Sequence, residues 1–383
     1  MGILKKIFIL VLLLFLFGEV IRIDLGNGIV LKPIDVGVGL IVFLWLVFKL
    51  KKSGEIKQKN ILVPILLFAA SALFSLIINY FSLSLNQFLT SLAYLIRWVI
   101  YAGIFFVVND FDRKFKKRIP FLLVAVGSVV IGLGYIQYFF YPSLKKLFYL
   151  GWDEHMYRMF SIFLDPNFAG AFFVLFFLFL FNLFFKKKNK FIGLLILLTL
   201  GAIFLTFSRS ALIMLIVSSS LLFISMNKKI LIGLLLGIIL LVLIISSKYF
   251  NVENINLFRV VSTEARLETA RNAIKIIQDH SIFGVGFNAY RYAQNRYGFR
   301  SEANAISHAD ASSDNSFLFV MATTGIIGFI LYLFLWLRLL KVASILAIAS
   351  VVGVFVDSMF INSLFYPFIM LWMWIVIGLT EST

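Results

Sequence analysis

The sequence contains no cysteine and few charged residues, and each shortage excludes a class of protein. Without cysteine among its 383 residues, the chain has no disulfide framework, no cysteine-based metal site and no cysteine nucleophile. Only 14% of the residues are charged and 62% are hydrophobic, whereas a soluble globular protein is roughly half apolar. No small-residue cleavage pattern follows the first apolar run, so we expect a retained first span rather than a signal peptide.

Long apolar runs fill most of the chain. A helix crosses a hydrocarbon core of roughly 30 Å with about 20 apolar residues, and its backbone hydrogen bonds are satisfied within the segment. Because the runs are continuous, we expect an all-α, polytopic integral membrane protein with about 12 transmembrane helices rather than a barrel. The expected spans are residues 7–23, 34–50, 61–80, 88–109, 119–140, 166–185, 191–207, 210–226, 230–247, 314–337, 342–360 and 362–379.

The basic residues gather in short clusters between the apolar runs. A net charge of +17 would suit a nucleic-acid partner, but such clusters are typical of cytoplasmic loops in membrane proteins, so we expect no nucleic acid. If every span is real, the clusters occupy alternate loops, which predicts a multi-pass protein of a bacterial or archaeal cytoplasmic membrane with both termini in the cytoplasm. The clusters lie at residues 51–59, 113–118, 186–190, 228–229 and 338–341.

The opposite, extracytoplasmic face carries a short loop near residues 141–165 and a large loop at residues 248–313. Since no repeat or linker divides the chain, we expect a single domain, residues 1–383, that includes the large loop. Within this loop, apolar residues at helical spacing predict an amphipathic helix over residues 264–278, lying on the bilayer or on the ends of the spans. The sequence FGVG, residues 283–286, predicts a helix end and a turn. The apolar stripe comprises Leu267, Ala270, Ala273, Ile274 and Ile277.

Three arginines are expected on the extracytoplasmic side, where the positive-inside rule does not require them: Arg158, Arg209 and Arg266. Arg209 lies in TFSRSA, residues 206–211, where two spans form a tight hairpin. Taken alone, Arg209 is equally well explained as an arginine that extends to the lipid headgroups. As a group, arginines favour a bidentate anion, and a diphosphate is the ligand that these three would suit.

Asp165 and Pro166 stand at the start of the sixth expected span, seven residues or more after Arg158. Aspartate is a preferred N-cap residue and proline suits the first helical turn, so capping explains both. Capping does not explain why Arg158 and Asn167 accompany them at one membrane depth.

The segment from residue 307 to 329 brings four polar residues to the start of the tenth expected span: His308, Asp310, Asp314 and Asn315. Asp314 is open to two interpretations, as a simple helix cap or as a catalytic residue. A carboxylate and a histidine that face the same compartment as the arginines favour the catalytic one. Asp310 and Asp314 could instead bind a divalent cation, but two carboxylates are weak support for a metal site.

These segments resemble the O-antigen ligase and O-antigen polymerase (Wzy-like) superfamily of polytopic, GT-C-like glycosyltransferases. RMFSIFLDPNFAG, residues 158–170, resembles the family's arginine followed by an NPN-type span start, and TFSRSALI, residues 206–213, resembles its T-x-SRS/A hairpin. EARLETARNAIKIIQDHSIFGVGFNAY, residues 264–290, resembles its segment that ends in D-P-L-F-G-V-G. The resemblance covers the C-terminal two-thirds of the chain, and we find no motif in the N-terminal third.

The family's last motif, His-Asn-x-x-Leu, differs here. Asp314-Asn315-Ser316-Phe317-Leu318 occupies its place, and Gly325 stands at the expected spacing behind it. The resembling ligases are thought to use the histidine as general base, which makes Asp314 the candidate base in this chain. His308 does not align with that histidine. The substitution weakens the ligase assignment more than the transferase assignment.

The resemblance implies a donor in which a glycan is linked to undecaprenyl diphosphate. The diphosphate would be held by Arg158, Arg209 and Arg266 while an acceptor hydroxyl attacks the anomeric carbon with inversion, without a metal or another cofactor. The expected partners are this donor, a glycan or lipid acceptor, and membrane lipids. Further substrate-binding residues are expected at Asn167, Arg271, His308 and Asn315.

Three functions remain open at this stage: polymerisation of lipid-linked repeat units, ligation of a finished glycan to a lipid or protein, and transport of a polysaccharide or lipid. Polymerase and ligase differ in the acceptor, which the sequence does not identify. A transporter typically carries ionisable residues near the middle of its spans. Such residues are nearly absent, and Asp357, within the eleventh expected span, is the exception.

Overall fold

The structure is a computed structural model that describes residues 1–26, 28–51, 55–56, 58–228, 230–249, 261–299 and 312–379. The α-helices are α1 (Gly2–Phe15), α2 (Pro33–Lys51), α3 (Lys59–Ile78), α4 (Leu85–Asn109), α5 (Arg113–Lys116), α6 (Ile119–Phe140), α7 (Pro166–Lys187), α8 (Lys190–Leu205), α9 (Arg209–Ser225), α10 (Ile230–Tyr249), α11 (Val261–Asp279), α12 (Tyr290–Arg296), α13 (Ser316–Val342), α14 (Ile345–Asp357) and α15 (Pro367–Gly378). Short 3₁₀ turns occur at Tyr80–Ser82, Lys145–Leu150, Ser161–Phe163 and Ser363–Phe365. Two strands, β1 (Ile23–Asp24) and β2 (Val30–Leu31), form an antiparallel hairpin.

The all-α expectation is confirmed, apart from this small hairpin, and each expected span overlaps an apolar helix. In the described part of the chain, six helices are long and apolar enough to cross a membrane: α2, α3, α4, the stretch Arg113–Phe140 that contains α5 and α6, α7 and α13. Helices α8, α9, α14 and α15 and the first part of α10 are apolar but shorter. The protein is therefore membrane-like, and the total of about twelve spans stays a prediction.

Helices α7 and α15 form the centre of the bundle. Every residue of α15 is buried, and Trp372 packs edge-on against Phe172, Phe176 and Phe179 of α7. Around them α15 packs on α4, α14 on α9, α7 on α8 and α13 on α3. Interlocked aromatic rings of this kind are favourable because each edge-to-face pair adds about 0.5–1.5 kcal/mol beyond burial of its area.

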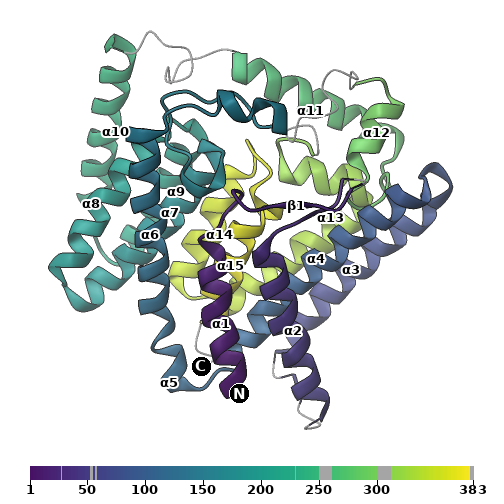
Figure 1. Ribbon diagram of the computed structural model, residues 1–383, viewed down its shortest axis with the longest axis horizontal. Helices are drawn as coiled ribbons and strands as arrows, with labels where there is room; N and C mark the ends of the chain where they lie inside the picture. The colour runs from purple at the N-terminus through teal and green to yellow at the C-terminus, as the bar shows by residue number, and fades with distance from the viewer. Residues whose placement is uncertain are drawn as a thin grey trace.

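The molecule has two distinct ends (Figure 1). The N-terminus and α5 lie at one end, whereas α11 and α12 lie at the other, with the β1–β2 hairpin on the same side as α11. The basic cluster of residues 113–118 is therefore at the same end as the N-terminus, and the cytoplasmic location of this end stays a prediction.

The first expected span, residues 7–23, is too long at its C-terminal side. Helix α1 ends at Phe15, and the chain turns at Gly18, whose φ is 55°. A side chain at Gly18 would collide with Ile162, and the backbone N–H of Glu19 donates to the Ile162 carbonyl at 2.8 Å. The apolar residues that follow Gly18 therefore belong to the β1–β2 hairpin and not to a helix.

The predicted amphipathic helix is confirmed as α11, but its buried stripe differs from the expected one. Ala273, Ile276 and Ile277 are buried in a cluster with residues of α12 and α13. Leu267 and Ile274 are instead 52% and 45% exposed. Helix periodicity leaves two neighbouring stripes possible, and the packing of α11 against α13 selects between them.

The glycine of the last motif interrupts α13. Gly325 has φ 65° and ψ −172°, and the N–H of the next residue, Ile326, donates to the Ser281 carbonyl at 2.8 Å. Just before the break, the Ala322 carbonyl accepts from the N–H of Val285 at 2.9 Å. The FGVG segment and Gly325, far apart in sequence, thus form one backbone junction that fixes α11 against α13.

Candidate functional site

Arg158 is a structural partner of the turn between α8 and α9. Only three residues separate these helices, which confirms the tight hairpin, and Phe207 has a φ of 49°. The Arg158 side chain is 3% exposed, and its guanidinium donates to the carbonyls of Thr206 at 2.8 Å and Phe207 at 3.4 Å. Since Arg209 is the first residue of α9, Arg158 fixes the backbone from which the Arg209 side chain extends.

Asp165 caps α7, as expected, and Asn167 connects α7 to the same turn. The Asp165 carboxylate accepts from the N–H groups of Asn167 at 2.6 Å and Phe168 at 3.3 Å. The side-chain oxygen of Asn167 accepts from Arg158 at 3.3 Å and from the Ser208 hydroxyl at 3.0 Å. This oxygen of Asn167 therefore holds the protein's own groups.

Arg266 of α11 lies among charged groups from three other segments. Burial raises the pKa of Asp165, while its bonds to backbone N–H groups and the nearby Arg158 and Arg266 act in the opposite direction. Arg266 also interacts electrostatically with Arg209 and with Asp357. We call Asp165, Arg209, Arg266 and Asp357 the arginine cluster. Because Arg209 and Arg266 repel each other, an anion between them would relieve an unfavourable interaction.

Asp357, a member of this cluster, does not lie within a span as the sequence predicted. It is the last residue of α14 rather than an inner residue of a span, and it is fully buried. One carboxylate oxygen of Asp357 accepts a hydrogen bond from the Ser363 hydroxyl. In the sequence, Asp357 is a carboxylate within an apolar run. In the structure it lies at a helix end, where it interacts electrostatically with Arg266.

Asp314 does not cap α13, so the capping interpretation is wrong. The N-cap is Asn315, whose side-chain oxygen accepts from the N–H groups of Phe317 at 2.9 Å and Leu318 at 3.0 Å. The Asp314 carboxylate instead accepts from the Thr269 hydroxyl of α11 at 3.1 Å.

Thr269 stands three residues after Arg266 and therefore on the same face of α11. The candidate base thus contacts a residue that stands about one helical turn from Arg266.

The other expected site residues are not brought to this cluster by any described contact. Arg271 is exposed and stands five residues after Arg266, which turns it about 140° around α11. His308 and Asp310 lie outside the described residues. Within the described ranges, no group of three or more histidine or carboxylate side chains is placed to hold a metal ion.

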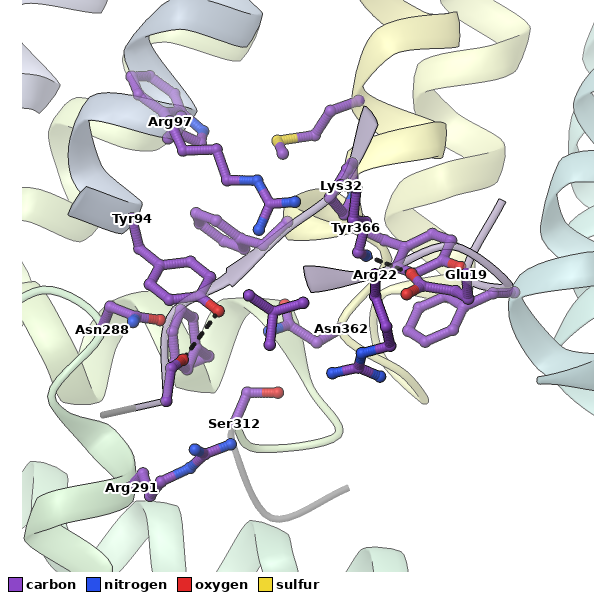
Figure 2. Close-up of a pocket in the computed structure, with 18 of the residues that line it drawn as sticks. Glu19, Arg22, Lys32, Tyr94, Arg97, Asn288, Arg291, Ser312, Asn362 and Tyr366 are labelled. Carbon is purple, nitrogen blue, oxygen red and sulfur yellow. Dashed lines mark hydrogen bonds and ion pairs between the residues drawn. The ribbon is translucent and has the colours of Figure 1, made fainter. Parts of the chain in front are cut away.

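A cavity of about 670 Å³ lies next to the arginine cluster (Figure 2). Most of the residues that line it belong to segments in which we found no sequence motif. From the N-terminal third it receives Glu19, Arg22, Asp24, Gly28, Val30, Lys32, Tyr94, Arg97 and Trp98. We call it the hairpin cavity, because the β1–β2 hairpin and its flanks form one wall. No local motif in the sequence indicates it, and several of its charged residues, Glu19, Arg22 and Arg97, lie within the expected spans.

Two cations in the wall of the hairpin cavity are already paired. Lys32 forms a buried ion pair with Glu19, and burial lowers the pKa of Lys32 while Glu19 opposes this. Arg97 binds both carboxylate oxygens of Asp35, at 2.9 Å and 2.5 Å. The Arg97–Asp35 pair holds the start of α2 against α4, because Asp35 is in the first turn of α2.

The hairpin cavity and the arginine cluster share a wall. Phe168 and Tyr366 both line the cavity, and their rings stack at 3.9 Å with an interplanar angle of 8°. Phe168 also donates its N–H to Asp165 of the cluster. The two regions are therefore neighbours that meet at Phe168.

Comparison with known families supports the resemblance found in the sequence. Residues 193–333 match the O-antigen ligase family. The resemblance to the O-antigen ligase and polymerase superfamily is thereby confirmed over the segment that carries Arg209, Arg266 and Asp314. Members of this family are ligase-like or polymerase-like enzymes that use a lipid-linked glycan and an acceptor. No curated protein matches the chain.

Proposed function

We propose that the protein is a membrane glycosyltransferase that polymerises surface-polysaccharide repeat units supplied on undecaprenyl diphosphate, at the extracytoplasmic face. The observation that carries this proposal is the position of Arg266. It interacts with Arg209 and Asp165 on one side, and on the other it shares a helix face with Thr269, which donates to Asp314. An anion site and a proton acceptor are thus held together by α11.

Arg209 and Arg266 would bind the diphosphate of the donor, and Arg158 would act as their positioning residue. Negative charge grows on the diphosphate as the glycosidic bond breaks, and preorganised guanidinium groups stabilise that charge without reorganising. Arg158 donates to two carbonyls of the α8–α9 turn and to Asn167, so its contribution is to fix the direction of Arg209.

Asp314 would serve as the general base. The acceptor hydroxyl oxygen attacks the anomeric carbon, its proton passes to the Asp314 carboxylate, and the bond from the anomeric carbon to the diphosphate oxygen breaks with its electron pair leaving on the diphosphate. The products are an elongated glycan of inverted configuration and undecaprenyl diphosphate. The Thr269 hydroxyl orients the Asp314 carboxylate for this role.

A ligase that transfers the finished glycan to a lipid or protein is the second candidate, since the matching family is described as O-antigen ligase. Its chemistry at the donor is the same, and only the acceptor differs. A transporter is less well supported, because Asp357, the apparent mid-span carboxylate, lies at the end of α14.

The role of Arg266 is tested with Arg266→Ala and Arg266→Lys in proteoliposomes that contain lipid-linked repeat units. We expect both variants to lose about 10²–10³-fold in transfer rate, as enzymes do when an oxyanion-stabilising donor is removed, because lysine cannot reproduce a planar bidentate contact. Arg113→Lys, an exposed arginine at the opposite end, is the matched control. If Arg266→Lys retains most of the activity, the bidentate role is wrong.

The compartment is tested by reporter fusions at two positions. We expect a reporter at residue 187, beside a basic cluster, to be cytoplasmic and a reporter at residue 285 to be extracytoplasmic. A cytoplasmic reporter at residue 285 would put the arginine cluster on the wrong side for a donor in the outer leaflet, and would refute the proposed function.

A further inference from the structure

A small apolar groove borders the hairpin cavity, between the β1–β2 hairpin and α4. Its volume is about 180 Å³, and the hairpin forms one side of it while α4 forms the other. Most of the side chains that line this groove are aliphatic: Ile29, Val30, Leu31, Ala93, Ile96 and Ile100. The groove is therefore suited to a hydrocarbon chain rather than to a sugar.

The groove faces the bilayer. Helices α2 and α4, which both contribute to its wall, are long and apolar enough to cross a membrane. Exposed apolar side chains recur along both helices at helical spacing: Val36, Leu40 and Phe43 on α2, and Leu85, Leu89 and Ile96 on α4. Ile96, which is 51% exposed, belongs both to this stripe and to the groove wall. A chain in the bilayer can therefore enter the groove sideways without crossing water.

The groove and the hairpin cavity share three wall residues, Val30, Tyr94 and Arg97. Tyr94 extends from α4 to the hairpin, where its hydroxyl donates to the Gly28 carbonyl at 3.3 Å (Figure 2). The guanidinium carbon of Arg97, whose side chain binds Asp35, lies 5.5 Å from the centroid of the Tyr94 ring. Along this shared wall the lining changes from aliphatic in the groove to polar and charged in the cavity, which suits an amphiphilic ligand.

The hairpin cavity is suited to sugar rings at the end of such a chain. Its volume of about 670 Å³ lies within the range of about 300–1,000 Å³ that small-molecule sites occupy. The charged side chains in its wall, such as Glu19 and Lys32, disfavour a hydrocarbon chain there. Aromatic rings and neutral amides, which pack on sugar faces and bond to hydroxyl groups, also line it: Trp98, Phe287, Asn288 and Asn362.

We propose that the groove and the hairpin cavity together hold the acceptor as a lipid-linked glycan, with the start of its polyprenyl chain in the groove and its sugars in the cavity. The word acceptor rests on the proposed function, whereas the binding of a lipid-linked glycan rests on the two spaces alone. Since the cavity meets the arginine cluster at Phe168, an acceptor held there lies beside the donor.

The groove and the cavity have different roles in this site. The groove is single and small, so it takes the start of one chain rather than the several chains of a multi-acyl lipid. A chain gains little by moving from the bilayer into an apolar groove, because lipid tails are as apolar as aliphatic side chains. The sugars therefore supply the selectivity through hydrogen bonds, and the groove sets their position.

The proposal is tested by photo-crosslinking in phosphatidylcholine nanodiscs that contain a small fraction of an undecaprenyl diphosphate-linked trisaccharide. The photoreactive residue p-benzoylphenylalanine replaces Ile96 at the groove or, as a matched control, Ala70, an exposed residue of α3. Mass spectrometry gives the ratio of polyprenyl adducts to phosphatidylcholine adducts at each position. We expect this ratio to be at least about tenfold higher at position 96 than at position 70, as two hydrogen bonds to the sugars provide.

Variants that carry the photoreactive residue at position 96 separate the groove from the cavity. Ala93→Trp fills the groove and should lower the ratio about tenfold, whereas Ala70→Trp, the same change on α3, should keep it. Asn288→Gly removes an amide from the cavity at a φ of 58°, which glycine adopts freely. It should lower the ratio about fivefold, the contribution of one hydrogen bond. Undecaprenyl diphosphate without sugars should give the ratio found at position 70.

Equal ratios at the two positions, or a high ratio with undecaprenyl diphosphate alone, would overturn the proposal, because the sugars would then not select the occupant. A ratio that Ala93→Trp and Asn288→Gly both leave unchanged would do the same. Arg266→Ala weakens the donor site and should leave the ratio at position 96 unchanged, and a fall would assign the groove to the donor and contradict the proposal. Since no transfer reaction enters this measurement, the proposed function and the lipid-linked glycan site can fail independently.

Discussion

The arginine cluster and the hairpin cavity are neighbours that meet at Phe168, yet they are built in different ways. The cluster is formed at helix ends, where caps and tight turns require particular residues, and it therefore leaves short motifs in the sequence. The cavity is formed by single side chains from many segments, and none of them needs a local backbone shape. A cluster built at helix ends can thus be visible in sequence while the cavity beside it is not.

A similar contrast holds between two arginines that the sequence treats alike. Arg158 is 3% exposed and donates to backbone carbonyls, whereas Arg266 is half-buried and faces other charged side chains. We therefore expect replacement of Arg158 to destabilise the fold, and replacement of Arg266 to slow the proposed reaction. The predictions below test how sharply this separation of structure and chemistry holds.

The largest effect is expected at Asp314. Asp314→Asn keeps size and shape but removes the proton acceptor, and a general base contributes typically 10²–10⁴-fold, so transfer should fall by that factor at unchanged thermal stability. Asp314→His should recover part of the activity with a pH optimum moved toward the imidazole pKa of about 6.5.

The neighbouring cap provides the contrast. Asn315→Ala should lower the free energy of unfolding by about 1 kcal/mol, because it removes the α13 N-cap. Transfer by Asp314→Asn at the wild-type rate would remove Asp314 from the mechanism and end the distinction between these two adjacent residues.

The next largest effect is expected at Gly325, in the backbone junction between α11 and α13. Gly325→Ala places a side chain at φ 65° and against the Ile282 carbonyl, so it should cost about 1–3 kcal/mol from backbone strain, with the collision added. We expect a lower unfolding temperature in detergent and loss of transfer, because α11 would leave its place against α13. Gly132→Ala, with open space around it in α6, is the control. Equal behaviour of the two variants would show that the junction does not position α11.

The smallest effect is expected at Arg271. It is exposed and lies on a different face of α11 from Arg266. Because an interaction of an exposed charge is worth at most ~1 kcal/mol, Arg271→Ala should change the transfer rate less than about threefold. Rates of Arg266→Ala and Arg271→Ala, measured side by side in proteoliposomes, sharpen the comparison. A loss at Arg271 as large as that at Arg266 would place substrate on both faces of α11.

Features set by a few neighbouring residues were predicted correctly. Asp165 and Pro166 form a cap and first turn because both preferences are local, and the short α8–α9 connection follows from adjacent apolar runs. The N-cap residue of α13 was not predicted correctly, because aspartate and asparagine cap about equally well and Asp314 and Asn315 are adjacent. Thr269 decides between them, from 45 residues away.

Features that depend on distant contacts could not be predicted. Helix α1 ends early because Gly18 meets Ile162, and α11 buries Ile276 rather than Leu267 because α13 lies on that side. The hairpin cavity is the extreme case, since its wall combines residues from the N-terminal third with Arg291 and Tyr366. Only the tertiary fold brings these side chains together.

The position of the diphosphate tests the central claim most directly, and it can be measured in an electron cryo-microscopy map of the protein with bound undecaprenyl diphosphate. We expect diphosphate density between the Arg209 and Arg266 guanidinium groups, within hydrogen-bond distance of both. Diphosphate density in the hairpin cavity, away from Arg209 and Arg266, would contradict the account, because the donor would then lie outside the arginine cluster.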